Sequence, residues 1–226
     1  MTGAAARKAA LAGIVGHVVW WVAIVVGAWL EADRLEGRAA RPGLRTGYSH
    51  VYSFVSELAA VGSDARVLMV TGFLVLGAAT VVLALATHRL WPAATALFVA
   101  VLVSGLGTLT AGSFTCDAGC PTDGDLSLAQ QVHNASSVVT FPAWMAGAAI
   151  AAWTFRGRRY GRLSLALAVA LVGTGLVLGT WQDRAPDDPV GLLQRANLAL
   201  VTAWFVLTVL ELRRPAPEGE GGRNRS

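Results

Sequence analysis

The most constraining feature of this chain is that its apolar residues are gathered into six runs of about twenty, the length that an α-helix needs to cross roughly 30 Å of hydrocarbon. Hydrophobic residues make up 54% of the chain and charged residues only 14%, a distribution that excludes an ordinary soluble domain. We therefore expect an all-α, polytopic membrane protein with a six-helix bundle. The spans are predicted at about residues 9–30, 66–86, 91–111, 128–155, 163–181 and 190–212.

These spans form one membrane domain over residues 9–212. Residues 1–8 precede it as a cytoplasmic tail, and residues 213–226, rich in Pro, Gly and charge, are expected to be a disordered cytoplasmic tail. The first apolar run is too long for the core of a cleaved signal peptide. Pro142 lies inside the fourth span and predicts a kink there.

The basic residues indicate orientation rather than nucleic-acid binding. The net charge is +4, but the arginines lie at the ends of apolar runs and form no patch interleaved with aromatic residues. Counting them places both termini in the cytoplasm, with the protein in the plasma membrane, although the loop after the first span is also basic. The interfacial tryptophans agree, with Trp29 and Trp181 at the outer boundary and Trp91 and Trp153 at the inner one.

Residues 48–60, YSHVYSFVSELAA, precede the second span and have a polar and an apolar side. We expect an extra amphipathic helix here, with Ser63 as the N-cap of the span that follows. Wound as a helix, the stretch carries its polar side chains on one stripe: Ser49, His50, Ser53, Ser56 and Glu57.

Polar side chains also interrupt the spans on the outer side. In the fourth span they recur at helical spacing and predict one inward stripe: Gln130, His133, Asn134 and Ser137. In the sixth span Arg195 is flanked by Gln194 and Asn197. An arginine at the centre of a membrane helix costs about 2.5–3.5 kcal/mol, so an acidic partner is expected. The candidates are Glu57, Asp117 and Asp183.

These groups predict an outward-facing polar pocket that binds a lipid headgroup or a small amphiphile. Its expected ligand-binding residues are His50, Ser53, Glu57, Asp117, His133 and Arg195. The alternative is a metal-assisted hydrolase at the outer leaflet, with His133, Glu57 and Asp117 as candidate catalytic residues and zinc as the metal. Two of these residues also have structural interpretations that involve no catalysis. His133 is then a hydrogen-bonded residue of the helix bundle, and Glu57 is the counter-ion of Arg195.

Two further pairs have open interpretations. Cys116 and Cys120 lie in a loop predicted to face an oxidising compartment, where a disulfide, two free thiols or a metal site are the alternatives. Gly175 and Gly179 form a GxxxG pair that indicates close helix packing or a homo-oligomer. Haem is disfavoured, because only His17 lies deep in a span and haem ligation across a bundle needs paired histidines.

Four motifs, taken in this order, resemble the bacterial integral membrane family known as domain of unknown function 998 (DUF998). They are Ser56-Glu57-Leu58, the Cys116-Asp117-Ala118-Gly119-Cys120-Pro121 loop, the His133-led start of the fourth span up to Phe141, and Gly191-Leu192-Leu193-Gln194-Arg195. The resemblance covers about residues 10–212. It implies a six-helix membrane protein and no settled activity, cofactor or partner beyond the bilayer.

Overall fold

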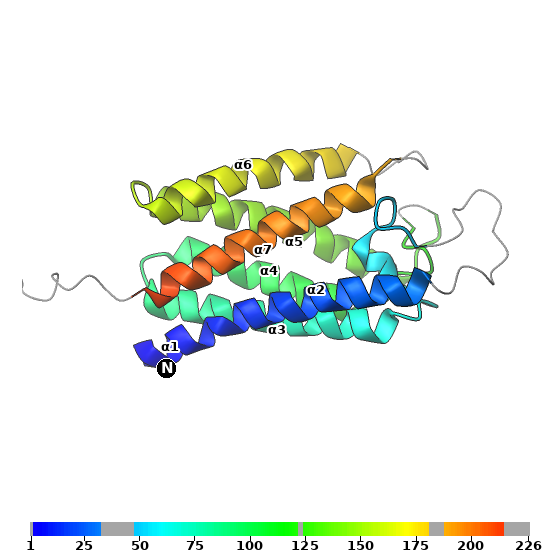
Figure 1. Ribbon diagram of the computed structural model, residues 1–226, viewed down its shortest axis with the longest axis horizontal. Helices are drawn as coiled ribbons and strands as arrows, with labels where there is room; N and C mark the ends of the chain where they lie inside the picture. Colours follow the sequence, from blue (N-terminus) through cyan, green and yellow to red (C-terminus); the bar gives the residue numbers. More distant parts are fainter. Residues whose placement is uncertain (1, 33–47, 122–123, 181–187, 215–226) are drawn as a thin grey trace, which may run out of the picture.

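The structure, a computed structural model, describes residues 2–32, 48–121, 124–180 and 188–214, and within these ranges it is helical with no strand. Figure 1 shows a long bundle whose helices run roughly parallel to its long axis. The elements are α1 (Gly3–Ala9), α2 (Leu11–Ala32), the 3-10 helix η2 (Val55–Ala59), α3 (Arg66–Leu90), α4 (Thr95–Ser113), α5 (Leu128–Thr154), α6 (Arg159–Thr180) and α7 (Val190–Arg213).

Six helical segments in the described residues are long and apolar enough to cross a membrane, which confirms the predicted architecture. The first of them begins at Gly3, so α1 continues the span into the residues expected to be a tail. The fourth, α5, runs as one helix through Pro142. Residues 215–226, Trp181 and Asp183 lie outside the described residues, and the predictions made for them stay predictions.

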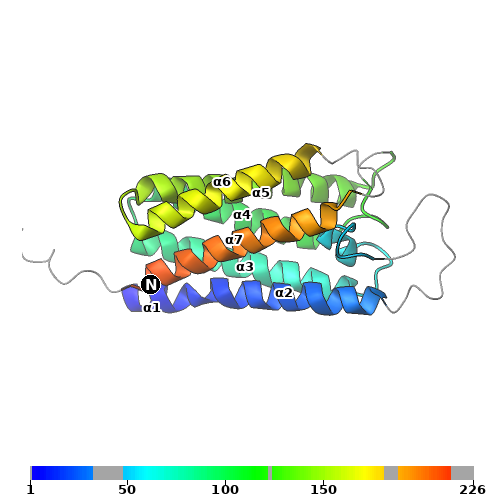
Figure 2. The ribbon, with the colours of Figure 1, turned by 45° about the horizontal axis from the view of Figure 1, so that its top comes forward.

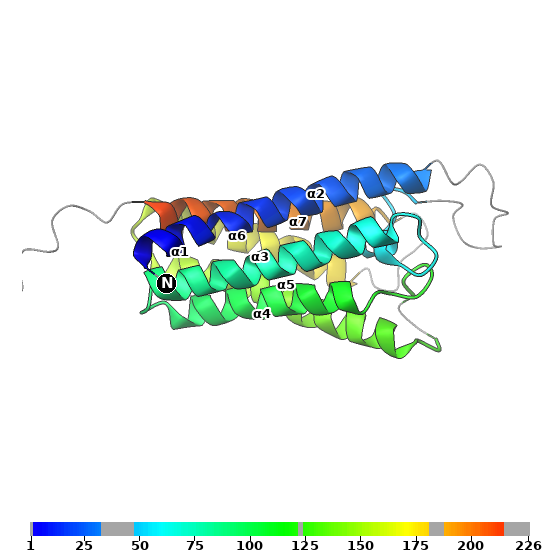
Figure 3. The ribbon, with the colours of Figure 1, turned by 90° about the horizontal axis from the view of Figure 1, so that it is seen from below.

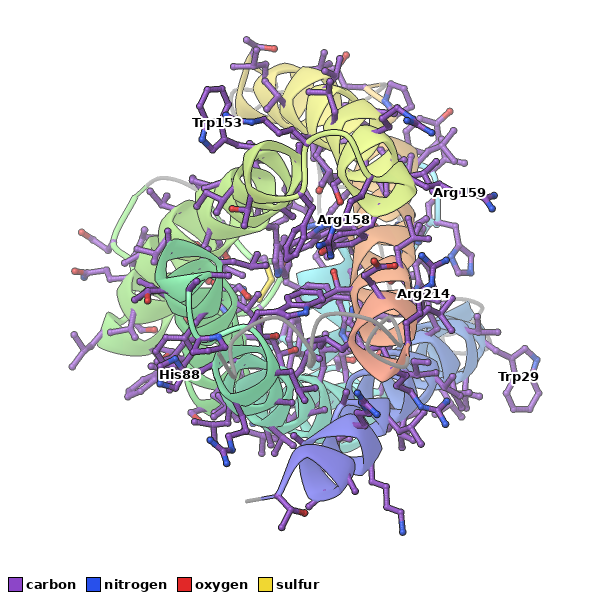
Figure 4. The ribbon with its side chains drawn as sticks, turned by 90° about the vertical axis from the view of Figure 1, so that its left-hand side faces the viewer. Trp29, His88, Trp153, Arg158, Arg159 and Arg214 are labelled. Carbon is purple, nitrogen blue, oxygen red and sulfur yellow. A yellow bond between two sulfur atoms is a disulfide. The ribbon has the colours of Figure 1, made fainter. Side chains whose placement is uncertain are left out.

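Helices that follow one another in the chain pack side by side, as α2 and α3 do along their length in Figure 3. Seen from one end, the six spans form a ring in which α7 returns to lie between α6 and α2 (Figure 4). Large side chains fill the interior of this ring, and Trp204 and Phe205 of α7 are fully buried there. Trp29 and Trp153 point outward from opposite ends of the bundle, as interfacial tryptophans should.

The bundle has two different ends. One, which we call the terminal end, holds α1 and the C-terminus of α7 (Figure 1). The other, the Arg195 end, holds the C-terminus of α2, η2, the cysteine loop and the first turns of α5 and α7. Nearly all of the polar residues predicted to form the site come from elements at the Arg195 end.

Residues 48–60 fold differently from the amphipathic helix expected there, because only Val55–Ala59 is helical and as a 3-10 turn. The reason is that backbone groups of this stretch form hydrogen bonds to α7 instead of to one another. The carbonyl of Val51 accepts from Leu192 N of α7 (3.0 Å), and Val55 N donates to Gln194 Oε1 (2.7 Å). Backbone groups that bind α7 in this way are not available for an α-helical ladder.

The start of α3 also differs from the prediction. Ser63 is not the N-cap, which is Ala65. The Ser63 hydroxyl instead donates to the Glu31 carboxylate at the end of α2 (2.6 Å) and accepts from Ala65 N (3.1 Å). Glu31 thereby places negative charge at the N-terminus of α3, where the helix dipole favours it.

Candidate functional site

Arg195 lies just over one turn into α7 and is bound by the backbone of residues 48–53. Its Nη1 donates to three carbonyl oxygens, those of His50 (2.9 Å), Ser53 (3.0 Å) and Gly191 (2.9 Å). Its Nη2 donates to the Tyr48 hydroxyl, whose ring also lies under the guanidinium at 5.5 Å. All four acceptors are neutral. Arg195 Nε is buried and makes no hydrogen bond to any described residue.

Gly191 is what allows this loop to lie against α7. A Cβ at Gly191 would overlap the carbonyl oxygen of Ser53 and approach that of His50 to 2.9 Å. The missing side chain therefore lets two loop carbonyls reach the first turn of α7, where Arg195 meets them from the next turn. We refer to Tyr48, His50, Ser53, Gly191 and Arg195 as the Arg195 cluster.

Glu57 supports the cluster from η2. Its carboxylate accepts a hydrogen bond from Phe54 N (2.8 Å), which fixes the turn that enters η2. Glu57 and Arg195 both act electrostatically on the Tyr48 hydroxyl, so the two charges lie in one neighbourhood. That Glu57 is the counter-ion of Arg195 stays a prediction, because the hydrogen bonds of the guanidinium go to neutral acceptors.

The electrostatics of the cluster are those of a partly buried cation. Burial raises the pKa of Tyr48 above its usual range, and Arg195 opposes that shift. The pKa of His50 is lowered, first by desolvation and then by the positive charge of Arg195. At neutral pH Tyr48 and His50 are therefore both neutral beside the guanidinium.

Asp117 belongs to a second cluster, formed by the cysteine loop and the start of α5. Its carboxylate accepts from the backbone N–H (3.0 Å) and the hydroxyl (2.7 Å) of Ser127, the N-cap of α5, and these bonds lower the pKa of Asp117. The Asp117 N–H in turn donates to Gln130 Oε1 (2.7 Å), and Gln130 is only 1% exposed. Asp117 thus ties the loop to the helix.

His133 is buried in α5, as its place on the inward stripe predicts. Its Nδ1 lies 3.1 Å from the carbonyl oxygen of Ala111 and 2.9 Å from that of Phe114, so the ring is protonated at Nδ1 and donates to the end of α4. Ala111 lies in the last turn of α4 and Phe114 is its C-cap, so neither carbonyl has an acceptor role within the helix. His133 therefore joins α4 to α5.

Cys116 and Cys120 form a disulfide, with their Cα atoms 5.0 Å apart. The disulfide packs against the segment that follows η2: the carbonyl of Cys116 accepts from Val61 N (3.0 Å), and the two cysteines form a small buried cluster with Ala60. Because Ala60 and Val61 follow η2 directly, and η2 carries Glu57, this contact connects the loop of Asp117 to the surroundings of the Arg195 cluster.

The residues predicted to form one site therefore do not form a single cluster. His50, Ser53 and Arg195 belong to the Arg195 cluster, with Glu57 beside it. Asp117 binds the start of α5, and His133 binds the end of α4. Tyr48, Gly191 and Gln194 were not among the predicted site residues, and the Gly-x-x-x-Arg spacing at the start of α7 is the signal that points to one of them, Gly191. Across the described parts of the chain, no three His, Cys, Asp or Glu side chains come together to hold a metal ion.

An apolar groove runs along the seam between α2 and α7. It has a volume of about 420 Å³ and is lined by one face of α2, from Ile14 to Val26, and by Thr202 and Val206 of α7. We call it the α2–α7 groove. Its polar groups have partners in the protein: Trp21 Nε1 donates to Thr202 Oγ1 (2.9 Å), and His17 Nδ1 bonds to the carbonyl of Gly13 (2.8 Å).

Comparison with known proteins gives one match. Residues 14–211 match the family described as "Protein of unknown function (DUF998)", over most of the chain and close to the range expected from the four motifs. No curated protein and no solved structure matches.

Proposed function

Because this chain belongs to the DUF998 family, whose description assigns no activity, we propose a function from the site alone: the protein binds an amphiphile by its anionic headgroup. The headgroup contacts the Arg195 cluster. The single observation that carries this proposal is that Arg195 is held in place by four neutral acceptors and keeps a buried Nε without a hydrogen bond to the described residues.

The chemistry of Arg195 favours an anion. A guanidinium offers five N–H donors in a planar fork that suits phosphate and carboxylate groups, and it stays charged at any physiological pH. Carbonyl oxygens orient the fork without removing its net charge. Partial burial strengthens the attraction to an anion, because the local dielectric is lower than that of water.

The position of the cluster favours a lipid-like ligand. Arg195 lies five residues after Val190, about 8 Å along the axis from the start of a membrane-spanning helix, and so near the boundary where headgroups lie. The exposed His50 and the Tyr48 ring flank it and are neutral at neutral pH, so neither repels an anion.

In this proposal the other predicted site residues have supporting roles. Ser53 contributes its carbonyl to Arg195, and Glu57 fixes the turn beside it. Asp117 and His133 hold the neighbouring loop and helices in place.

We further propose that the Arg195 end faces outward across the plasma membrane and that the terminal end is cytoplasmic. Exposed basic side chains at the terminal end support this: Lys8, Arg89, Arg156, Arg158, Arg159 and Arg214, several of them labelled in Figure 4. A fluorescent protein that matures only in the cytoplasm, fused to the C-terminus, checks the orientation; absence of fluorescence in a stably expressed fusion would contradict it.

The proposal is tested by binding of the purified full chain to phosphatidylglycerol, an anionic lipid, and to zwitterionic phosphatidylcholine in nanodiscs or by native mass spectrometry. We expect preference for phosphatidylglycerol, and loss of about tenfold or more in Arg195→Gln, since a charge-assisted hydrogen bond contributes roughly 1.5–3 kcal/mol. Arg66→Gln is the matched control, because it removes the same charge from an exposed residue at the same end.

Equal binding of both lipids, or wild-type binding by Arg195→Gln, would overturn the proposal. If Arg195→Gln does not fold, the wild-type protein still gives an answer. Its affinity for phosphatidylglycerol must fall as salt is raised, because part of the attraction is between charges. Affinity independent of salt would reject a charged headgroup.

A further inference from the structure

The α2–α7 groove opens to the surroundings of the bundle rather than to its interior. The valines on its α2 side are among the most exposed apolar side chains of the spans, and Val22 is 53% exposed. In a membrane-spanning bundle an exposed apolar flank faces lipid. The groove is therefore continuous with the hydrocarbon of the bilayer.

The register between α2 and α7 is set by two contacts. Trp21 is hydrogen-bonded to Thr202, and the rings of His17 and Phe205 are 5.0 Å apart. The two helices are antiparallel. Moving seven residues from Thr202 toward the N-terminus of α7 therefore covers about the same distance along the bundle as moving seven residues from Trp21 toward the C-terminus of α2. Arg195 thus lies level with Ala28, just beyond the upper end of the groove at Val25 and Val26.

Arg195 also shares a face of α7 with the groove. Seven residues make almost two full helical turns, so Arg195 and Thr202 point in nearly the same direction, about 10 Å apart along the axis. Val206, four residues further on, continues that stripe. Figures 1 and 2 show α2 and α7 diverging toward the Arg195 end, with the segment of residues 48–60 between their ends.

The dimensions of the groove select its occupant. From Ile14 to Val26 it extends twelve residues, about 18 Å, close to half of the roughly 30 Å hydrocarbon core and so to the depth of one leaflet. Spread over that length, 420 Å³ corresponds to a cross-section of about 23 Å² (420 Å³ divided by 18 Å), so only a narrow chain can lie inside the groove. The space fits one hydrocarbon chain.

We propose that the α2–α7 groove holds a single hydrocarbon chain of the amphiphile whose anionic headgroup lies at Arg195. This inference rests on the proposed function and specifies its ligand class: an anionic lipid or single-chain amphiphile of the leaflet at the Arg195 end. The headgroup and the chain are then bound by one continuous surface of α7, with Arg195 at its top and Val206 at its base.

The test uses two probes that separate the chain from the headgroup. Lysophosphatidylglycerol with a 16-carbon chain carries both parts, and glycerol 3-phosphate carries an anionic head and no chain. Val22→Trp fills the groove, and Val138→Trp adds the same bulk to an exposed site on α5, where Val138 is 68% exposed. Binding of each probe to each full-length variant is measured in detergent.

We expect Val22→Trp to weaken lysophosphatidylglycerol binding by about tenfold or more and to leave glycerol 3-phosphate binding unchanged, while Val138→Trp changes neither. Wild-type binding of the lysolipid by Val22→Trp would overturn the groove proposal and leave the headgroup site standing. If glycerol 3-phosphate fails to bind but the lysolipid binds and is lost in Val22→Trp, the groove stands and the headgroup site fails. Binding of neither probe to the wild-type protein would overturn both.

Discussion

Two seams of the ring are built differently. Where α3 meets α4, glycines bring the backbones into contact: a Cβ at Gly77 would lie 2.7 Å from Leu109 N and 3.0 Å from the carbonyl oxygen of Gly105. Where α2 meets α7, valines stand at the surface and the Trp21–Thr202 hydrogen bond bridges the gap. In lipid, helices associate by close packing rather than by escape from water. A seam where branched side chains stand at the surface therefore stays open to hydrocarbon.

The largest expected effect comes from adding volume to the closed seam. Gly77→Val places a branched side chain against the Leu109 backbone, which cannot move as a side-chain tip can. We expect a loss of about 3 kcal/mol or more in the free energy of unfolding, at the upper end of overpacking effects. Thermal or denaturant unfolding in detergent measures it.

Val22→Phe is the matched control, because it adds at least as many heavy atoms to the open seam as Gly77→Val adds to the closed one. It should change stability by less than about 0.5 kcal/mol, as a substitution on an exposed surface does. Comparable losses in the two variants would show that the α2–α7 groove is as tightly packed as the α3–α4 contact, and the distinction between the seams would fail.

A smaller effect is expected where the loop of residues 48–53 meets α7. Gly191→Ala drives the Ser53 carbonyl away from the helix and with it the acceptors of Arg195. Alanine gains up to about 1 kcal/mol over glycine in helix propensity, but overpacking costs about 1–3 kcal/mol, so we expect a net loss of roughly 1–2 kcal/mol together with weaker binding of phosphatidylglycerol.

Gly173→Ala in α6 isolates the propensity term, since nothing lies within 4 Å of a Cβ there. That variant should be as stable as the wild-type protein or more so. If Gly191→Ala behaved like Gly173→Ala, the close approach of the loop to α7 would not matter for either stability or the Arg195 cluster.

The two seams also show what the sequence can and cannot predict. Apolar run length predicts the spans because the thickness of the bilayer fixes it, and helical spacing correctly predicts that Gln130 and His133 face inward. The loop of residues 48–54 was predicted as a helix because side-chain periodicity says nothing about which backbone groups α7 will bind. Periodicity does not predict the groove either. Exposed valines on a spanning helix give the same sequence pattern whether the neighbouring helix packs against them or leaves a gap.

The smallest expected effect concerns the charge state of the loop that closes the top of the open seam. The lowered pKa of His50 means that the folded protein disfavours the imidazolium, first through desolvation and then through Arg195. Below pH 6.5, the usual value for histidine, the unfolded chain binds a proton at His50 that the folded chain resists, so stability falls as pH falls.

We expect the melting temperature to drop more between pH 7 and pH 5 in the wild-type protein than in His50→Gln. The neighbouring Tyr48, whose pKa is raised by burial, is neutral throughout this range and does not contribute to the difference. Bound phosphatidylglycerol should reduce the drop, because a negative headgroup offsets the charge that His50 gains beside Arg195. An identical drop in melting temperature in the two proteins would show that the charge of His50 is not coupled to Arg195. A larger drop with bound lipid would show that the headgroup does not lie near His50.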